Sequence, residues 1–99
     1  MTLSNEQKKH FRSIGHTLKP TVTVAGKGLS EGVMAELERA LEDHELVKVK
    51  LALEEKSDRS AITDSLCAAT GATLVQSVGK MALIFRAATK PDPAKSRIR

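Results

Sequence analysis

The sequence predicts a two-layer α/β fold, a four-stranded mixed sheet with three helices on one face of it. Helical and alternating apolar patterns follow one another in the order α-β-α-β-α-β-β. Strand–helix–strand units favour right-handed parallel crossovers, and a two-residue hairpin at Gly79-Lys80 adds an antiparallel strand. A chain of 99 residues has room for one such domain.

The first helix is expected to begin after Ser4, which can form a capping box with Gln7. Apolar residues then recur at helical spacing until the Lys19-Pro20 pair, which breaks the pattern. The run Thr21–Val24 alternates β-branched residues, which predicts a short strand.

A second helix is expected after Ser30, a good N-cap, with Val33, Leu37 and Leu41 as its buried stripe. The alternation from Leu46 to Leu53 then predicts a strand with one solvated face.

The third helix is expected to be capped by Ser57 or Asp58 and stopped by Gly71. Two strands follow, Thr73–Val78 and Met81–Arg86, and the hairpin joins them.

With all helices on one face, the other face of the sheet is expected to be wet. It would present Thr21, Thr23, Lys48 and Lys50. Residues 1–88 are expected to form the single domain. Residues 89–99 are basic, hold two prolines and contain little that is apolar, which predicts a disordered tail.

Charge is segregated along the chain. Residues 1–28 hold five basic residues against one acidic residue, and residues 80–99 hold six against one. Residues 29–45, which include the second helix, hold six acidic residues against one basic residue. This pattern implies one basic and one acidic face, and a basic face attracts polyanions. A solvated surface with no partner would give the same counts.

The loop Ala25-Gly26-Lys27-Gly28 lies between a predicted strand and the start of a predicted helix. Glycines let the backbone approach a phosphate closely, and the free N–H groups of a helix N-terminus attract anions. Lys27 adds a positive charge, so the loop is a candidate phosphate clamp. A tight turn between a strand and a helix is the plainer interpretation of the same residues.

Several other classes of function find no support. The loop fits neither the P-loop nor the dinucleotide-binding glycine spacing, so we expect no nucleotide chemistry. No histidine or cysteine has metal-ligand spacing, and Cys67 stands alone. We therefore expect no enzyme, no cofactor, no small-molecule substrate and no metal. Residues 1–10 are polar, no apolar run reaches membrane-spanning length, and one cysteine forms no internal disulfide, which together predict a cytoplasmic protein.

Several motifs, in this order, resemble the CRM domain family (chloroplast RNA splicing and ribosome maturation), and within it the bacterial stand-alone YhbY-type members. The resemblance runs from about Leu3 to Arg86. The motifs are Leu3-Ser4, Gly15-His16-Thr17-Leu18-Lys19-Pro20, Gly28-Leu29-Ser30-Glu31-Gly32-Val33, His44-Glu45-Leu46-Val47-Lys48-Val49-Lys50, Thr70-Gly71-Ala72, Val78-Gly79-Lys80 and Phe85-Arg86.

The resemblance implies a fold similar to the C-terminal domain of translation initiation factor three. It also implies binding of ribosomal RNA in precursors of the large (50S) subunit, and hence a role in ribosome assembly. The family's GxxG loop corresponds to residues 25–28, with Ala25 where the family has glycine. If that position needs a positive φ, Ala25 is strained by about 1 kcal/mol or more; otherwise Gly26 takes the unusual conformation.

The expected RNA-binding surface combines the loop with the basic first helix and the wet sheet face. Its residues are Ala25, Gly26, Lys27, Gly28, Lys8, Lys9, Arg12, His16 and Lys19, with Lys48, Lys50, Lys80 and Arg86 as second-rank candidates. Because the wet face has no aromatic side chain, we expect contacts to the backbone and shape of RNA more than to its bases.

The expected protein is a monomer that acts by binding. Two alternatives remain open from the sequence. One is a protein-interaction module whose acidic second helix docks a basic ribosomal protein, and the other is a nucleotide-dependent enzyme.

Overall fold

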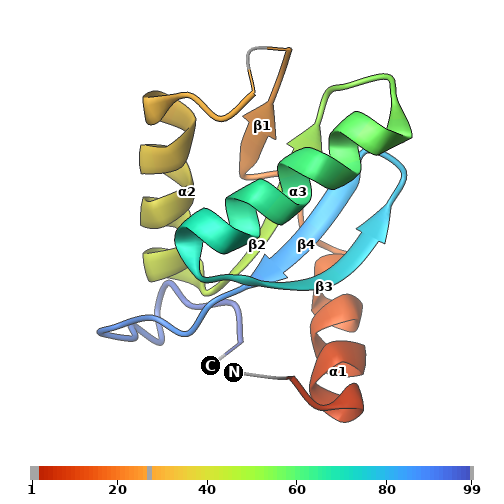
Figure 1. Ribbon diagram of the computed structural model, residues 1–99. Coiled ribbons are helices and arrows are strands. Elements are labelled where there is room, and N and C mark those ends of the chain that lie inside the picture. Colours follow the sequence, from red (N-terminus) through yellow and green to blue (C-terminus); the bar gives the residue numbers. More distant parts are fainter. Residues whose placement is uncertain (1–2, 27, 99) are drawn as a thin grey trace.

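The computed structural model describes residues 3–26 and 28–98, which form three helices and one four-stranded sheet (Figure 1). The elements are α1 (Asn5–Gly15), β1 (Val22–Val24), α2 (Glu31–His44), β2 (Leu46–Leu51), α3 (Lys56–Thr70), β3 (Thr73–Val78) and β4 (Met81–Phe85). The strands lie in the order β1-β2-β4-β3, with β1 parallel to β2 and the other neighbours antiparallel. The predicted α/β class, element order and mixed sheet are confirmed.

The helix caps explain where the helices begin. Ser4 and Gln7 form the expected capping box, since the Ser4 hydroxyl accepts from the Gln7 N–H at 3.1 Å and the Gln7 side chain accepts from the Ser4 N–H at 2.9 Å. The Ser30 hydroxyl caps α2 by accepting from the Val33 N–H at 3.2 Å. The expected cap of α3 at Ser57 or Asp58 is wrong, because this helix begins earlier, at Lys56.

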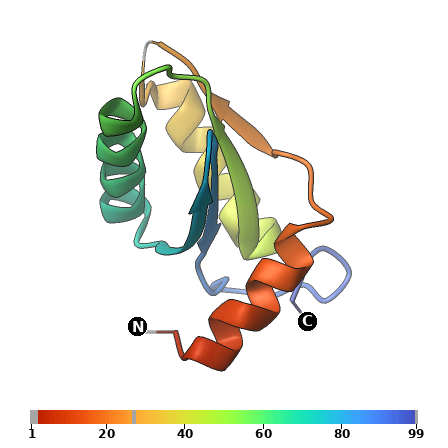
Figure 2. The ribbon, with the colours of Figure 1, turned by 90° about the vertical axis from the view of Figure 1, so that its right-hand side faces the viewer.

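The prediction that all three helices share one face of the sheet is wrong. Helices α2 and α3 cover one face, and α1 lies on the opposite face (Figure 2). The reason is a second apolar cluster at the end of the sheet where β2 starts and β4 finishes. This cluster contains Leu3, Phe11, Leu46, Val75, Leu83 and Phe85. A face with so many apolar side chains at one end needs a cover.

Two contacts fix α1 against the sheet. The rings of Phe11 and Phe85 lie 4.9 Å apart between centroids, within the range of attractive aromatic pairs. At the end of the helix, Gly15 passes so close to β4 that a Cβ there would lie 2.6 Å from a methyl carbon of Leu83. Any larger residue at position 15 would force Leu83 or the helix to move.

The described part of the tail, residues 89–98, lies against the C-terminal end of α2, although its composition predicts disorder. The Glu42 carboxylate accepts hydrogen bonds from the N–H groups of Thr89 at 3.1 Å and Lys90 at 3.0 Å. The buried carboxylate of Glu45 accepts from the Ser96 hydroxyl at 2.8 Å. Ile98 also packs against the apolar cluster beneath α1. Composition gives no sign of these contacts, and the disorder of the tail stays a prediction.

Acid is expected to release the tail from Glu42. The N–H groups of Lys90 and Thr89 hold the pKa of this carboxyl below its ordinary value, because they bind its charged form. The stabilisation is therefore complete above the pKa of the unfolded chain and is lost as the pH falls through the lower, folded pKa. In an NMR titration, the amide shifts of Thr89 and Lys90 should follow the Glu42 carboxyl. In Glu42→Gln they should no longer respond to acid over that range, and a response that persists would contradict this assignment.

Candidate nucleic-acid interface

The glycine loop is a closed turn at the head of α2. The Gly28 N–H donates to the Ala25 carbonyl at 2.9 Å, and the Ser30 N–H donates to the Gly28 carbonyl at 3.1 Å. Only Gly28 among the described residues of this loop has a positive φ, at 71°. Ala25 therefore carries no such strain, and the unusual conformation falls on Gly28 rather than on Gly26. Lys27, the expected phosphate contact, lies outside the described residues.

The glycine turn and the β3–β4 hairpin lie at the same end of the sheet. Two hydrogen bonds link the strand ends there. The Leu51 N–H donates to the Lys80 carbonyl at 2.6 Å, and the Ala52 N–H donates to the Val24 carbonyl at 2.8 Å. The Lys80 ammonium lies 3.1 Å from a carboxylate oxygen of Glu54. An exposed pair of this kind contributes at most about 1 kcal/mol, so Lys80 can exchange this partner for a phosphate at low cost.

Lys50 stands on the part of the sheet face that α1 leaves uncovered. It is exposed, and it lies in register with Thr23 on β1 and Met81 on β4. Among the described residues no ion pair or hydrogen bond engages its ammonium. Figure 2 shows that α1 covers one end of this face only. The predicted wet face therefore exists over part of the sheet. There Lys50 offers an ammonium group that has no partner among the described residues.

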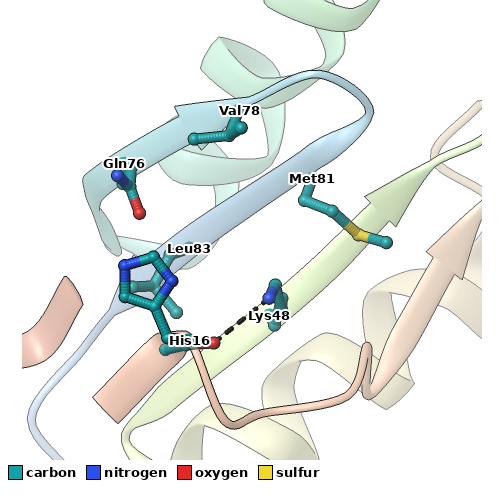
Figure 3. Close-up of a pocket in the computed structure, with 7 residues that line it drawn as sticks. His16, Lys48, Gln76, Val78, Met81 and Leu83 are labelled. Carbon is teal, nitrogen blue, oxygen red and sulfur yellow. Dashed lines mark hydrogen bonds between the residues drawn. The ribbon is translucent and has the colours of Figure 1, made fainter. Parts of the chain in front are cut away.

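Lys48 has a different role from the one expected. Its ammonium donates to the Gly15 carbonyl at 3.1 Å (Figure 3). It also lies 3.4 Å from the Leu18 carbonyl. These carbonyls lie at and just beyond the C-terminal end of α1, where a cation is favoured by the helix dipole. Lys48 therefore helps to seat α1 on the sheet.

The basic residues of α1 divide by exposure. Lys9, His16 and Lys19 are exposed, whereas Lys8 and Arg12 are half-buried. Helix α1 lies on the opposite face of the sheet from the acidic helix α2. The basic residues of α1 are therefore further from the acidic residues of α2 than they would be if all three helices shared one face.

Arg86 does not join the other candidates. It lies at the opposite end of the sheet from the glycine turn. Its guanidinium is 2.7 Å from a carboxylate oxygen of Glu38 and donates to the Thr70 carbonyl at 2.9 Å. A second carboxylate, that of Glu42, lies 3.9 Å away. Arg86 thus ties β4 to α2 and α3, and these carboxylates of the acidic helix already have partners within the chain.

The open face holds a hollow that the sequence analysis missed. It has a volume of about 140 Å³ and lies between the end of α1 and the β3–β4 hairpin (Figure 3). Its lining residues are Gly15, His16, Lys48, Gln76, Val78, Met81 and Leu83. The alternation of β3 gives no signal for this site, because a bulge in that strand changes which residues reach this face.

The remaining chemical groups do not form a second site. Burial, and then the nearby Asp64 carboxylate, raises the pKa of the Cys67 thiol, which disfavours the thiolate needed of a nucleophile. Within residues 3–26 and 28–98, no three histidine, cysteine or acidic side chains are grouped so as to hold a metal ion. No helix in the same ranges has the length and apolar character to cross a membrane.

The fold and this surface define a small α/β domain with a glycine turn beside a basic, partly open sheet face. The chain belongs to the CRS1/YhbY (CRM) domain family, whose model matches residues 3–86. It is 61% identical over 98 residues to a protein of Pseudomonas aeruginosa named as a probable RNA-binding protein, covering 99% of this chain and 94% of the relative.

Two further proteins are similar over most of their length. An RNA-binding protein of Haemophilus influenzae is 40% identical over 85 residues, which is 86% of each chain. The solution structure of a hypothetical protein from Staphylococcus aureus, named as a candidate RNA-binding protein, superimposes with a TM-score of 0.78. That structure is 29% identical in sequence and covers 90% of this chain and 93% of its own.

Proposed function

We propose that this chain is an RNA-binding protein of the cytoplasm that binds ribosomal RNA in precursors of the large ribosomal subunit and assists their assembly. One observation carries the RNA-binding part of this proposal. The glycine turn and Lys80 lie at the same end of the sheet. Lys50 lies beside them, on the face of the sheet opposite to the acidic helix α2. The names of the relatives supply the class of ligand, and the ribosomal target rests on the family.

The proposed mechanism is binding without covalent chemistry. Backbone N–H groups of the turn and the ammonium groups of Lys27, Lys50 and Lys80 would contact phosphates, and His16 and Lys19 would extend the surface along α1. Contacts of this kind release counterions from RNA, so affinity should fall steeply as salt rises. The chain would act as a monomer.

Replacing Lys27 with alanine is expected to weaken binding to ribosomal RNA fragments about three- to fivefold at moderate salt, because one phosphate contact is lost. Gel-shift titrations across a salt series would measure this, with Lys90→Ala as the control at the opposite end of the molecule. Affinity that does not weaken as salt rises, for the wild type, would overturn the proposal of phosphate contact. Equal affinities of wild type and Lys27→Ala would place the contact away from the turn.

The ribosomal target has its own test. In sucrose gradients of a cell extract, the protein is expected to sediment with precursors of the large subunit rather than with polysomes. Lys27→Ala should shift part of it to the top of the gradient. If the wild-type protein stays at the top of every gradient, the ribosomal part of the proposal fails. RNA binding is then judged separately, from the measurements with pure components.

A further inference from the structure

The hollow on the open sheet face combines an apolar floor with a polar rim. Val78, Met81 and Leu83 supply the apolar side chains, and His16 and Gln76 supply polar groups that face one another across one end (Figure 3). Val78 is 61% exposed, which makes it the most exposed large apolar side chain among the described residues. With Met81 and Leu83 it forms an apolar lining beside a few polar groups, which is the combination found in ligand-binding sites.

A β-bulge in β3 builds this arrangement. Thr73 pairs with Phe85 and Leu74 with Ile84, but Gln76 then pairs with Leu83, so Val75 is the extra residue. Without the bulge, Gln76 and Val78 would alternate onto the face covered by α3. With it, both turn onto the open face. Bulges commonly re-aim side chains at functional sites, and this one brings an amide and an apolar side chain to the same hollow.

The rim has hydrogen-bonding groups to spare. The Gln76 amide carries two donor hydrogens and one acceptor oxygen, and the His16 ring carries one donor and one acceptor when neutral. Neither side chain makes a hydrogen bond within the part of the chain that the structure describes. An amide of this kind can pair with the edge of a nucleobase in two places at once.

We propose that this hollow binds one unpaired nucleobase of the RNA strand, with the ring against Val78 and Met81 and its edge toward Gln76 and His16. The proposal rests on the RNA binding proposed above and specifies it further. A volume of about 140 Å³ is below the ~300–1,000 Å³ of pockets for drug-sized ligands, and it suits one planar ring system.

The charges around the hollow favour a nucleotide over an apolar protein side chain. Lys50 is the register partner of Met81, so its ammonium stands beside the floor of the hollow on the same face. Lys48 lines the hollow, with its ammonium bound to the carbonyls of Gly15 and Leu18, and Lys80 precedes Met81 at the hairpin. A base seated in the hollow would leave its phosphate on the side of the Lys50 ammonium, with Lys80 next along the hairpin. The expectation of backbone contacts alone is thereby extended to one base contact.

NMR on the wild-type protein tests the base contact directly, because the chain has only two glutamines and they lie apart. Adenosine, guanosine, cytidine and uridine 5′-monophosphates are titrated in turn, and ribose 5-phosphate serves as the control without a base. The Gln76 side-chain amide and the Met81 methyl should shift with at least one nucleotide and stay in place with ribose 5-phosphate. The internal controls are the Gln7 amide in the α1 capping box and the Met34 methyl under α2, which should not shift.

Two variants of β3 separate the base site from RNA binding in general. Val78→Ala should weaken binding of a single-stranded RNA about two- to threefold, because apolar contact with the ring is lost. Leu74→Ala is its matched control, since Leu74 is also exposed, at 37%, but faces the other side of the same strand. Gln76→Leu should weaken binding about five- to tenfold and reduce the difference between bases, because a good edge contact discriminates by about that much or more.

The outcomes distinguish the two proposals. If the wild type binds no RNA, the proposed function fails. If it binds RNA, yet nucleotides and ribose 5-phosphate give the same shifts, or a fully paired duplex binds as well as a single strand, the base site is overturned while RNA binding stands. Shifts of the Met81 methyl that depend on protein concentration alone would assign the hollow to contact between copies of the chain, and would also overturn the base site.

Discussion

Replacing Phe11 with alanine is expected to lower the free energy of unfolding by about 3–5 kcal/mol, the usual cost of truncating a buried phenylalanine. Phe11 is the ring through which α1 docks on the sheet, against Phe85. Its loss leaves a cavity beneath α1 and removes an aromatic contact. Total stabilities of small domains are about 5–15 kcal/mol, so this change removes a large share.

Urea unfolding followed by far-UV circular dichroism would measure the effect, since the chain has no tryptophan or tyrosine to serve as a fluorescent reporter. Val78→Ala is the control, because truncating an exposed apolar side chain should change stability by no more than about 0.5 kcal/mol. A loss below about 1 kcal/mol for Phe11→Ala would contradict the docking of α1 through this ring.

Replacing Lys50 and Lys80 together with alanine is expected to weaken RNA binding about tenfold at moderate salt, a larger effect than that of Lys27 alone. Each lysine that contacts a phosphate adds about 0.7–0.9 to the slope of log affinity against log salt, so the double variant should lose about 1.5. Fluorescence anisotropy with a labelled ribosomal RNA fragment, repeated over a salt series, gives both quantities.

The chain offers a matched control for this experiment. Lys90 and Lys95 lie in the tail, away from the glycine turn. They resemble the pair Lys50 and Lys80 in their contacts with acidic residues. One member of each pair lies near a carboxylate, Lys80 near Glu54 and Lys95 near Asp43. The Lys90→Ala, Lys95→Ala double variant makes the same change in net charge and should keep most of the affinity and the slope. Equal losses for the two double variants would show that net charge, rather than this face, governs binding.

The order of the elements could be read from the sequence because each signal is local. The capping box at Ser4, the N-cap at Ser30 and the glycine turn at Gly79 each act within three or four residues, and the structure has all of them. Family membership likewise followed from short motifs in the right order, and the family model matches residues 3–86.

What could not be read from the sequence depends on contacts between distant segments. Helical spacing shows that Phe11 is buried, but it does not show on which face of the sheet. Alternation places Lys48 on the opposite face of β2 from Val47. It does not show that the ammonium binds two carbonyls 33 and 30 positions away, at and just beyond the end of α1. The hollow requires knowledge of pairing between β3 and β4, and composition alone does not reveal that two glutamates hold the tail.

The bulge at Val75 lets two successive residues of β3 face the same side of the sheet. Val75 joins the apolar cluster beneath α1, and Gln76 lines the hollow. Removing Val75 would leave the other residues of the strand opposite the same partners on β4, in regular alternation, so Gln76 and Val78 would keep the open face. The extra residue therefore adds a side chain to the core without displacing the residues of the surface. Relatives that lack a residue at this point of β3 would keep the hollow and lose part of the packing under α1.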